Sequence, residues 1–218
     1  MDQGLIRLLT TGCSELKLDL SENTIQQLVK YTELLIKWNK VYNLTSITEP
    51  REIIIKHILD SLAIVPHLED KQSNIIDIGT GAGLPGVILA IVRPELSVSL
   101  LDSNNKKTAF LQQVKIQLQL NNVHVINQRV ENTIPERLFD AIISRAFASL
   151  VDYIKVVEHL VKPEGMIYAM KSKLSDIEIA EFLEFQKLNQ LKTFANIENL
   201  VIIVPYLSEN RNLIKIYN

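Results

Sequence analysis

A cluster of glycines constrains this chain more than any other feature of its sequence. Four of the seven glycines lie between Gly79 and Gly86, directly after the apolar run 74–78. A buried strand that ends in a glycine-rich turn and continues into a helix brings bare backbone close to a ligand. A second apolar run ends at Asp102, where α/β sheets of this kind place a carboxylate that binds a ribose. Together the two features predict a pocket for a cofactor that contains adenosine.

From residue 74 onward, short apolar runs alternate with amphipathic segments. The predicted strands are 74–78, 97–102, 123–126, 139–144, 165–170, 200–205 and 211–217, and the predicted helices are 85–93, 105–120, 149–161 and 176–190. This alternation is typical of a mostly parallel sheet with helices on both faces. The last two strands are too close in sequence for a crossover helix, so we expect an antiparallel hairpin. The predicted fold is therefore a Rossmann-like α/β fold with seven strands.

The first 70 residues show helical periodicity instead. Apolar residues at helical spacing predict three helices, at about residues 5–9, 21–36 and 50–65. The polar and aromatic stretch 38–45 is predicted to be a loop or a frayed helix end. We place a boundary in the polar stretch 69–73. It divides a helical N-terminal extension (1–70) from an α/β domain (71–218).

Composition narrows the possible partners and the location. Because the net charge is −2, a nucleic acid would have to be held by a local basic patch rather than by the field of the whole molecule. No apolar run approaches the ~20 residues that cross a bilayer, and the N-terminus has no signal-peptide pattern. The single cysteine, Cys13, excludes an internal disulfide, and the four histidines form no metal-ligand pattern. We expect a monomeric cytoplasmic protein with neither a membrane segment nor a metal.

The glycine turn matches the patterns of two cofactor classes. Starting at Gly81, it fits the G-x-G-x-x-G pattern of nicotinamide and flavin enzymes, which bind a pyrophosphate at a helix N-terminus. Starting at Asp77, it fits the D/E-x-G-x-G-x-G turn of S-adenosylmethionine-dependent methyltransferases, where the carboxylate opposes a cationic ligand. Pro85 removes one N–H from the helix start and so weakens a phosphate site. The sequence favours the methyl donor, and an NAD(P)-dependent oxidoreductase is the alternative.

The end of the strand 139–144 bears on the methyl acceptor. Arg145 follows this strand, at the sheet edge where α/β proteins carry out their chemistry, and the turn lacks the Pro-Pro of exocyclic-amine methylases. Arginine is the commonest partner of guanine, and guanine N7 already carries the lone pair that attacks a methyl group. Methylation there needs positioning rather than a general base. Arg145 is therefore the candidate catalytic residue; in the alternative interpretation it only pairs with an acid such as Glu131.

Several segments also carry a family resemblance. They are Asp77-Ile-Gly-Thr-Gly-Ala-Gly-Leu-Pro-Gly86, Leu100-Leu-Asp-Ser103, Arg129-Val-Glu131 and Ile143-Ser-Arg-Ala-Phe-Ala-Ser149, with Trp38-Asn39 and His57-Ile-Leu-Asp-Ser-Leu62 upstream. In these residues the chain resembles the RsmG (GidB) family, bacterial enzymes that methylate guanine N7 in 16S rRNA. The resemblance implies S-adenosyl-L-methionine as cofactor and 16S rRNA of the small ribosomal subunit as partner. It assigns Gly79, Leu84, Val130, Glu131 and Arg145 to the cofactor and methyl-transfer site, to which we add Asp77, Gly81, Gly83, Asp102 and Ser103.

Basic residues near the predicted site are candidates for phosphate contacts. The predicted RNA-binding residues are Arg51, Arg93, Lys106, Lys107, Lys171 and Arg211. His57 and Asp60 are neighbours on one helix face, and we expect them to brace the junction between the two parts of the chain. A second alternative for the whole protein is a non-catalytic rRNA-binding assembly factor that has kept a cofactor fold.

Overall fold

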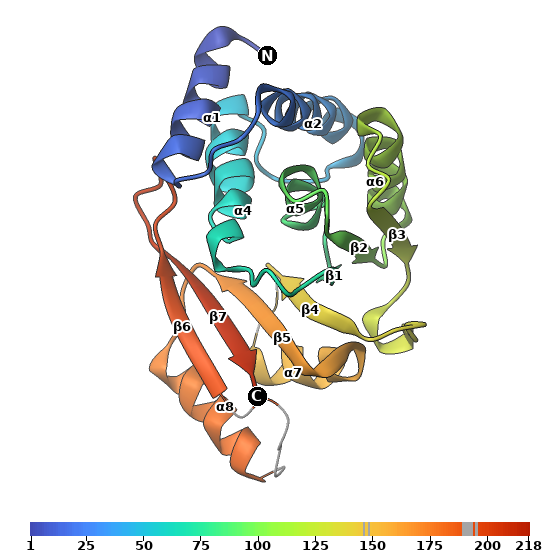
Figure 1. The fold of residues 1–218 in the computed structure, drawn as a ribbon, viewed down its shortest axis with the longest axis vertical. Helices are drawn as coiled ribbons and strands as arrows, with labels where there is room; N and C mark the ends of the chain where they lie inside the picture. Colours follow the sequence, from blue (N-terminus) through green and yellow to red (C-terminus); the bar gives the residue numbers. More distant parts are fainter. Residues whose placement is uncertain (146, 148, 189–193, 195) are drawn as a thin grey trace.

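A seven-stranded sheet forms the centre of the computed structural model, which describes residues 1–145, 147, 149–188, 194 and 196–218. The strands lie in the order β3-β2-β1-β4-β5-β7-β6 (Figure 1). They are β1 (Asn74–Ile78), β2 (Ser97–Asp102), β3 (Val123–Asn127), β4 (Phe139–Ser144), β5 (Val161–Lys171), β6 (Asn196–Ile202) and β7 (Arg211–Tyr217). The first five strands pair in parallel, whereas β7 is antiparallel to both β5 and β6. The predicted α/β fold with a terminal antiparallel hairpin is confirmed.

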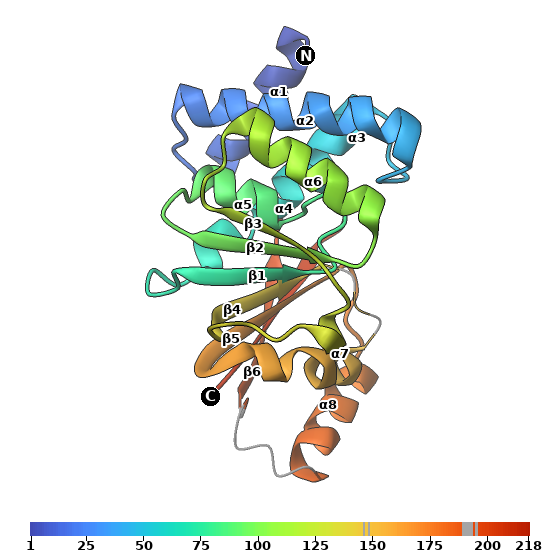
Figure 2. The same ribbon diagram turned by 90° about the vertical axis from the view of Figure 1, so that its right-hand side faces the viewer.

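Helices cover both faces of this sheet (Figure 2). One face carries α5 (Gly86–Val92) and α6 (Asn105–Leu118), and the other carries α7 (Leu150–Val157) and α8 (Asp176–Leu188), with short 3₁₀ turns η2 (Val65–His67), η3 (Val130–Asn132) and η4 (Glu158–Leu160) between elements. Successive strand side chains point to opposite faces. Ile75 therefore belongs to the core under α5 and α6, and Ile76 to the core under α7 and α8.

The N-terminal helices extend the first of these two cores. They are α1 (Gln3–Glu15), α2 (Glu22–Tyr42), α3 (Pro50–Ile53), the π-helical turn η1 (Ile54–Leu59) and α4 (Asp60–Leu62). Leu28 and Leu35 of α2 are fully buried in the same cluster as Leu111 of α6. The buried Tyr31 hydroxyl donates a hydrogen bond of 2.7 Å to the carbonyl of Ala82, inside the glycine turn. The helices thus support the turn directly, while the boundary near residue 70 stays a prediction.

The stretch 38–45, predicted to be a loop or a frayed helix end, is regular helix in its first half, because α2 continues to Tyr42. Trp38 is held against α6, where its ring centroid lies 5.6 Å from that of Phe110. The helix ends at Asn43, which adopts the left-handed conformation with φ of 49°. Asparagine reaches this conformation more readily than other residues with a side chain, so it stops the helix. Tertiary packing of an aromatic residue outweighs the polar local sequence here.

The hairpin strand predicted at 200–205 is also shifted. β6 pairs with β7 from Asn196, opposite Tyr217, to Ile202, opposite Arg211. The apolar residues that follow Ile202 belong to the connection to β7, which contains Pro205 and Tyr206 at φ of 64°. Pairing with β7 therefore sets the ends of β6, not the apolar run. The predicted end of the helix at residue 190 lies outside the described residues.

Candidate functional site

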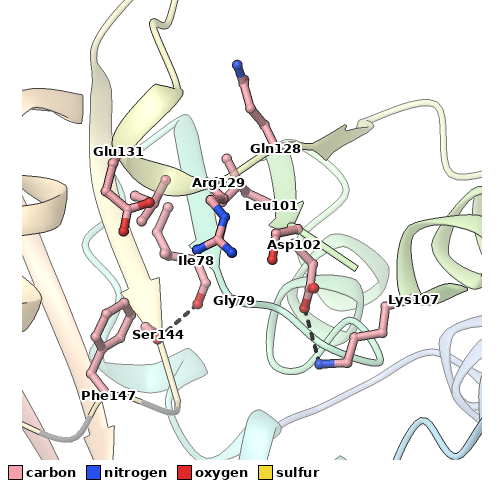
Figure 3. Close-up of a pocket in the computed structure, with 12 residues that line it drawn as sticks. Ile78, Gly79, Leu101, Asp102, Lys107, Gln128, Arg129, Glu131, Ser144 and Phe147 are labelled. Carbon is pink, nitrogen blue, oxygen red and sulfur yellow. Dashed lines mark hydrogen bonds and ion pairs between the residues drawn. The ribbon is translucent and has the colours of Figure 1, made fainter. Parts of the chain in front are cut away.

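A cavity of about 340 Å³, which we call the glycine-turn pocket, lies beyond the carboxyl ends of β1, β2 and β4 (Figure 3). The chain leaves β1 toward β2 on one side, and β4 lies on the other, so this is the switch point at which α/β sheets bind ligands. Its lining residues are Ile78, Gly79, Leu101, Asp102, Ser103, Lys107, Gln128, Arg129, Val130, Glu131, Ser144 and Phe147. The predicted cofactor residues Gly79, Asp102, Ser103, Val130 and Glu131 are thus brought together.

The glycines of the turn play two different roles. Gly79 and Gly81 have φ of +66° and +62°, and a Cβ atom at Gly79 would meet nothing within 4 Å. Bare backbone there faces open space, as a ligand cradle requires. A Cβ atom at Gly83 or Gly86 would instead lie 2.3 Å from a buried side chain, so Gly86 allows α5 to pack closely on the sheet at Leu100, and Gly83 leaves room for Val87. Gly83 and the buried Leu84 are not among the residues that line this cavity, and their assignment to the cofactor stays a prediction.

Asp77 holds the turn from beneath. Its Oδ2 accepts hydrogen bonds from Thr80 Oγ1 at 2.6 Å and from the Gly86 N–H at 2.7 Å. Its Oδ1 is buried and has no hydrogen-bond partner among the described residues. Burial raises the pKa of Asp77 to about 7, against the opposing effect of these two hydrogen bonds. Asp77 does not line the pocket, so its first effect is to fix the shape of the turn.

Asp102 presents a carboxylate to the pocket from the end of β2. Its Oδ2 accepts from the Gly81 N–H at 3.0 Å and lies 3.5 Å from Lys107 Nζ (Figure 3), and its Oδ1 accepts from the Asn104 N–H at 2.9 Å. A carboxylate can accept about four hydrogen bonds. Asp102 therefore braces the glycine turn and keeps acceptor capacity for a ligand hydroxyl.

The opposite wall comes from the segment after β3. Val130 and Glu131 belong to the 3₁₀ turn η3, and Arg129 points into the pocket between Asp102 and Glu131 (Figure 3). We did not predict Gln128, Arg129 or Phe147 from the sequence as cofactor-site residues. Their position just past the ends of β3 and β4 is the signal that could have indicated them.

A second cavity of about 240 Å³, the arginine pocket, lies beside the first. It is lined by Ile47, Lys56, His57, Asp60, Arg145, Met170, Lys171, Ser172 and Arg211, from four separate segments of the chain. The two pockets meet at the end of β4, where Ser144 lines the first and Arg145 the second. Arg145 is thus at the border of the cofactor site rather than among its lining residues.

Asp60 organises the arginine pocket. It is only 4% exposed, and its Oδ1 accepts from Arg211 Nε at 2.9 Å while its Oδ2 accepts from Arg145 Nη1 at 3.3 Å. Arg145 also donates to the carbonyl of Lys56. Its acidic partner is therefore Asp60 and not Glu131. As predicted, Asp60 joins the helical extension to the sheet, and it does so through β4 and β7 at once.

His57 contributes a neutral ring to this pocket. Its Nε2 lies 2.8 Å from Thr45 Oγ1, and its Nδ1 lies 3.4 Å from Arg145 Nη2. Burial and the nearby Arg145 charge lower the pKa of His57 to about 4. The same Nδ1 lies 3.1 Å from the carbonyl of Lys56, which can only accept, so the ring carries its proton on Nδ1 when it bonds Lys56 and on Nε2 when it accepts from Arg145. The positive charge of the pocket therefore comes from its lysines and arginines.

The predicted RNA-binding residues are divided among several places. Lys107 lines the glycine-turn pocket, whereas Lys171, paired with Glu178, and Arg211 line the arginine pocket. Arg51 and Lys106 are exposed outside both. The predicted position of Arg93 beside the site is wrong. It ends α5 at the opposite, amino edge of the sheet, where it pairs with Asp70 and Glu95.

Comparisons with known proteins agree with this architecture. The family described as GidB, rRNA small subunit methyltransferase G, matches residues 24–203. Two proteins named Ribosomal RNA small subunit methyltransferase G are similar to this chain. The protein from Burkholderia ambifaria is 44% identical over 97% of this chain and 92% of its own length. The protein from Hydrogenovibrio crunogenus is 48% identical over 87% of this chain and 83% of its own length.

The solved structures add a likeness of fold. A SAM-dependent methyltransferase from Aquifex aeolicus matches with a TM-score of 0.54 at 18% identity, covering 84% of this chain and 97% of that one. Within the described part of the chain, no helix has both the length and the apolar character to cross a membrane.

Proposed function

The chain belongs to the rRNA small subunit methyltransferase G family, and we propose that it transfers a methyl group from S-adenosyl-L-methionine to N7 of a guanine in 16S rRNA. The observation that carries this proposal is the family match over residues 24–203, combined with a sheet edge that offers two adjoining pockets of different chemistry. Family membership does not favour the NAD(P)-dependent oxidoreductase. We also propose that the protein is a monomer, acts in the cytoplasm and needs no metal.

The glycine-turn pocket suits S-adenosyl-L-methionine, which supplies an electrophilic methyl group on a sulfonium. Asp102 would accept hydrogen bonds from the ribose hydroxyls, and the half-buried Val130 offers an apolar surface for the adenine. The open backbone at Gly79 suits the amino-acid end of the cofactor. Glu131 and Asp102 place two carboxylates in the pocket for a cationic ligand, beside the cations Lys107 and Arg129.

The arginine pocket suits the target base. An arginine that donates to guanine O6 leaves the N7 lone pair available. That lone pair forms the new N–C bond while the bond from methyl to sulfur breaks and its electron pair stays on sulfur. No side chain has to accept a proton in this step, so Arg145 would act by orienting the base at the border of the two pockets. Lys171 and Arg211 supply positive charge for the neighbouring phosphates.

Methyl transfer to rRNA from a strain that lacks this protein tests the proposal. We expect tritium from labelled S-adenosyl-L-methionine to enter 16S rRNA, either naked or in 30S particles, and mass spectrometry to detect 7-methylguanine. The same rRNA from a strain that has the protein is the control, because its target is already methylated. A blank on both substrates would favour the non-catalytic assembly factor. Binding of NADH without S-adenosyl-L-methionine in calorimetry would favour the oxidoreductase.

A further inference from the structure

A third cavity, of about 410 Å³, lies outside both pockets, between α2 and α6; we call it the α2–α6 groove. Lys37, Trp38, Val41 and Tyr42 of α2 line one side of it. The rings of Trp38 and Tyr42 stack with centroids 5.1 Å apart and an interplanar angle of 28°. Val41 is 71% exposed and Tyr42 40% exposed. The groove therefore presents flat aromatic and apolar surface to solvent.

The same two helical segments carry a strong excess of positive charge. Residues 34–42 and 105–118 together contain five lysines and no acidic residue, although the whole chain has a net charge of −2. Lys37 lines the groove, and Lys106 lies two helical turns before Gln113, which lines it from α6 together with Gln117. Lys106 therefore shares the groove face of α6. A ligand that matches this surface is anionic and has flat rings.

The position of the groove connects it with both pockets. α2 and α6 lie side by side in Figure 1 and Figure 2. α6 begins three residues after Asp102, and its Lys107 lines the glycine-turn pocket. After α2, the chain passes directly to Thr45, which contacts His57, and to Ile47, which lines the arginine pocket. The two helices of the groove are therefore continuous in sequence with residues that line both pockets.

We propose that the α2–α6 groove binds a single-stranded segment of the 16S rRNA substrate next to the target guanine. This inference rests on the proposed function. Bases stack on Trp38 and Tyr42, and phosphates lie near Lys37 and Lys106. Stacking of bases on aromatic side chains tolerates any sequence, and lysines follow the phosphate backbone. A protein partner would instead match an apolar groove without the five lysines of residues 34–42 and 105–118, of which only Lys107 pairs with an acid, Asp102, in the described part of the chain.

Fluorescence of Trp38 provides a direct test, because it is the only tryptophan of the chain. We expect naked 16S rRNA to quench this fluorescence, and added salt to reverse the quenching. Lys37→Glu should weaken the binding of rRNA that the quenching of Trp38 reports. It should also raise the KM for rRNA about tenfold and change kcat by less than that. Tyr42→Ala should raise the KM in the same direction through lost stacking. Lys187→Glu makes the same charge change on an exposed position of α8, on the other face of the sheet, and is the matched control.

The outcomes separate this proposal from the proposed function. If the unaltered protein methylates 16S rRNA but its fluorescence does not change, and Lys37→Glu has the same KM as Lys187→Glu, the groove proposal is overturned and the proposed function stands. If the variants lose activity on 30S particles but keep it on naked rRNA, the groove binds a ribosomal protein and the RNA proposal is again overturned. If the unaltered protein methylates neither substrate, the proposed function is overturned, and the quenching of Trp38 by rRNA alone decides whether the groove binds RNA.

Discussion

The glycine-turn pocket and the arginine pocket share one sheet edge but are built in different ways. The first is formed by residues at or just after the ends of β1 to β4, among them the bare backbone of Gly79 and the carboxylate of Asp102. The second is formed by charged side chains from four segments, and Asp60 is the carboxylate that bonds both arginines. The main chain at Gly79 thus shapes the first pocket, whereas the second depends on side chains whose positions depend on each other.

This difference predicts how the two sites respond to change. A substitution in the glycine-turn pocket should alter cofactor affinity and leave the rRNA contacts intact. A substitution in the arginine pocket should alter the placement of the base, and with it turnover, because ion pairs that share a buried carboxylate act together. The predictions below test that separation.

The largest expected effect follows from Arg145→Ala. It removes the guanidinium that borders both pockets, while Asp60 keeps its hydrogen bond with Arg211. We expect kcat for rRNA methylation to fall about 100-fold, or about 3 kcal/mol, with the cofactor Kd within about twofold of the original. Single-turnover methyl transfer and calorimetry with S-adenosyl-L-methionine measure the two quantities.

Arg145→Lys is the matched control, because it keeps the charge but not the planar fork. It should recover only part of the lost turnover if the guanidinium orients the base. Unchanged kinetics in Arg145→Ala would remove Arg145 from the reaction. A loss in cofactor affinity alone would assign Arg145 to the glycine-turn pocket and break the proposed division.

The contrast also explains which parts of the site the sequence predicts. The turn at Gly79 and the acid at Asp102 are local: strand ends and chain spacing bring them together whatever the rest of the chain does. The pairing of Asp60 with Arg211 joins residues 151 positions apart, and no local pattern encodes it. The π-helical turn η1, which carries His57 into the pocket, has no sequence signal of its own either.

Within the turn, the sequence shows where glycines are needed. It does not show whether a glycine makes room for a ligand or for a side chain of the core. Gly83 has the same place in the motif as a cofactor glycine, yet its missing side chain makes room for Val87. Only the direction in which a Cβ atom would point separates a ligand-facing glycine from a packing one. The same limit applies to Arg93, whose charge suggested RNA although its helix carries it to the opposite edge of the sheet.

A smaller effect is expected from Asp102→Ala, which changes the other pocket. Loss of hydrogen bonds to a charged group should weaken S-adenosyl-L-methionine binding by about 1.5–3 kcal/mol, with rRNA affinity unchanged. Calorimetry and filter binding measure the two affinities. Because Asp102 also accepts from the Gly81 and Asn104 N–H groups, urea unfolding of Asp102→Asn serves as the structural control. Cofactor binding within twofold of the original in a folded Asp102→Ala protein would exclude a ribose contact.

The two regions should also respond differently to pH, since Asp77 in the first and His57 in the second are buried titratable groups with shifted pKa values. The pKa of Asp77 is raised by burial from 3.8 to about 7, so its stabilising effect is complete below pH 3.8 and is lost as the pH rises to about 7. The pKa of His57 is lowered from 6.5 to about 4 by burial and Arg145, so its stabilising effect is complete above pH 6.5 and is lost as the pH falls. Between pH 7 and pH 5 the two contributions change by about 2 kcal/mol each, in opposite directions.

Relative to the unaltered protein, His57→Gln should therefore gain unfolding free energy as the pH falls from 7 to 5, and Asp77→Asn should lose it. Urea denaturation at both pH values measures these differences, and other carboxylates cancel because all three proteins share them. If Asp77→Asn does not fold, His57→Gln alone still tests the direction in which His57 changes the unfolding free energy between pH 7 and pH 5. If the unfolding free energies of the three proteins changed with pH in parallel, neither His57 nor Asp77 would have the shifted pKa that its burial predicts. The two regions would then not differ in their response to pH.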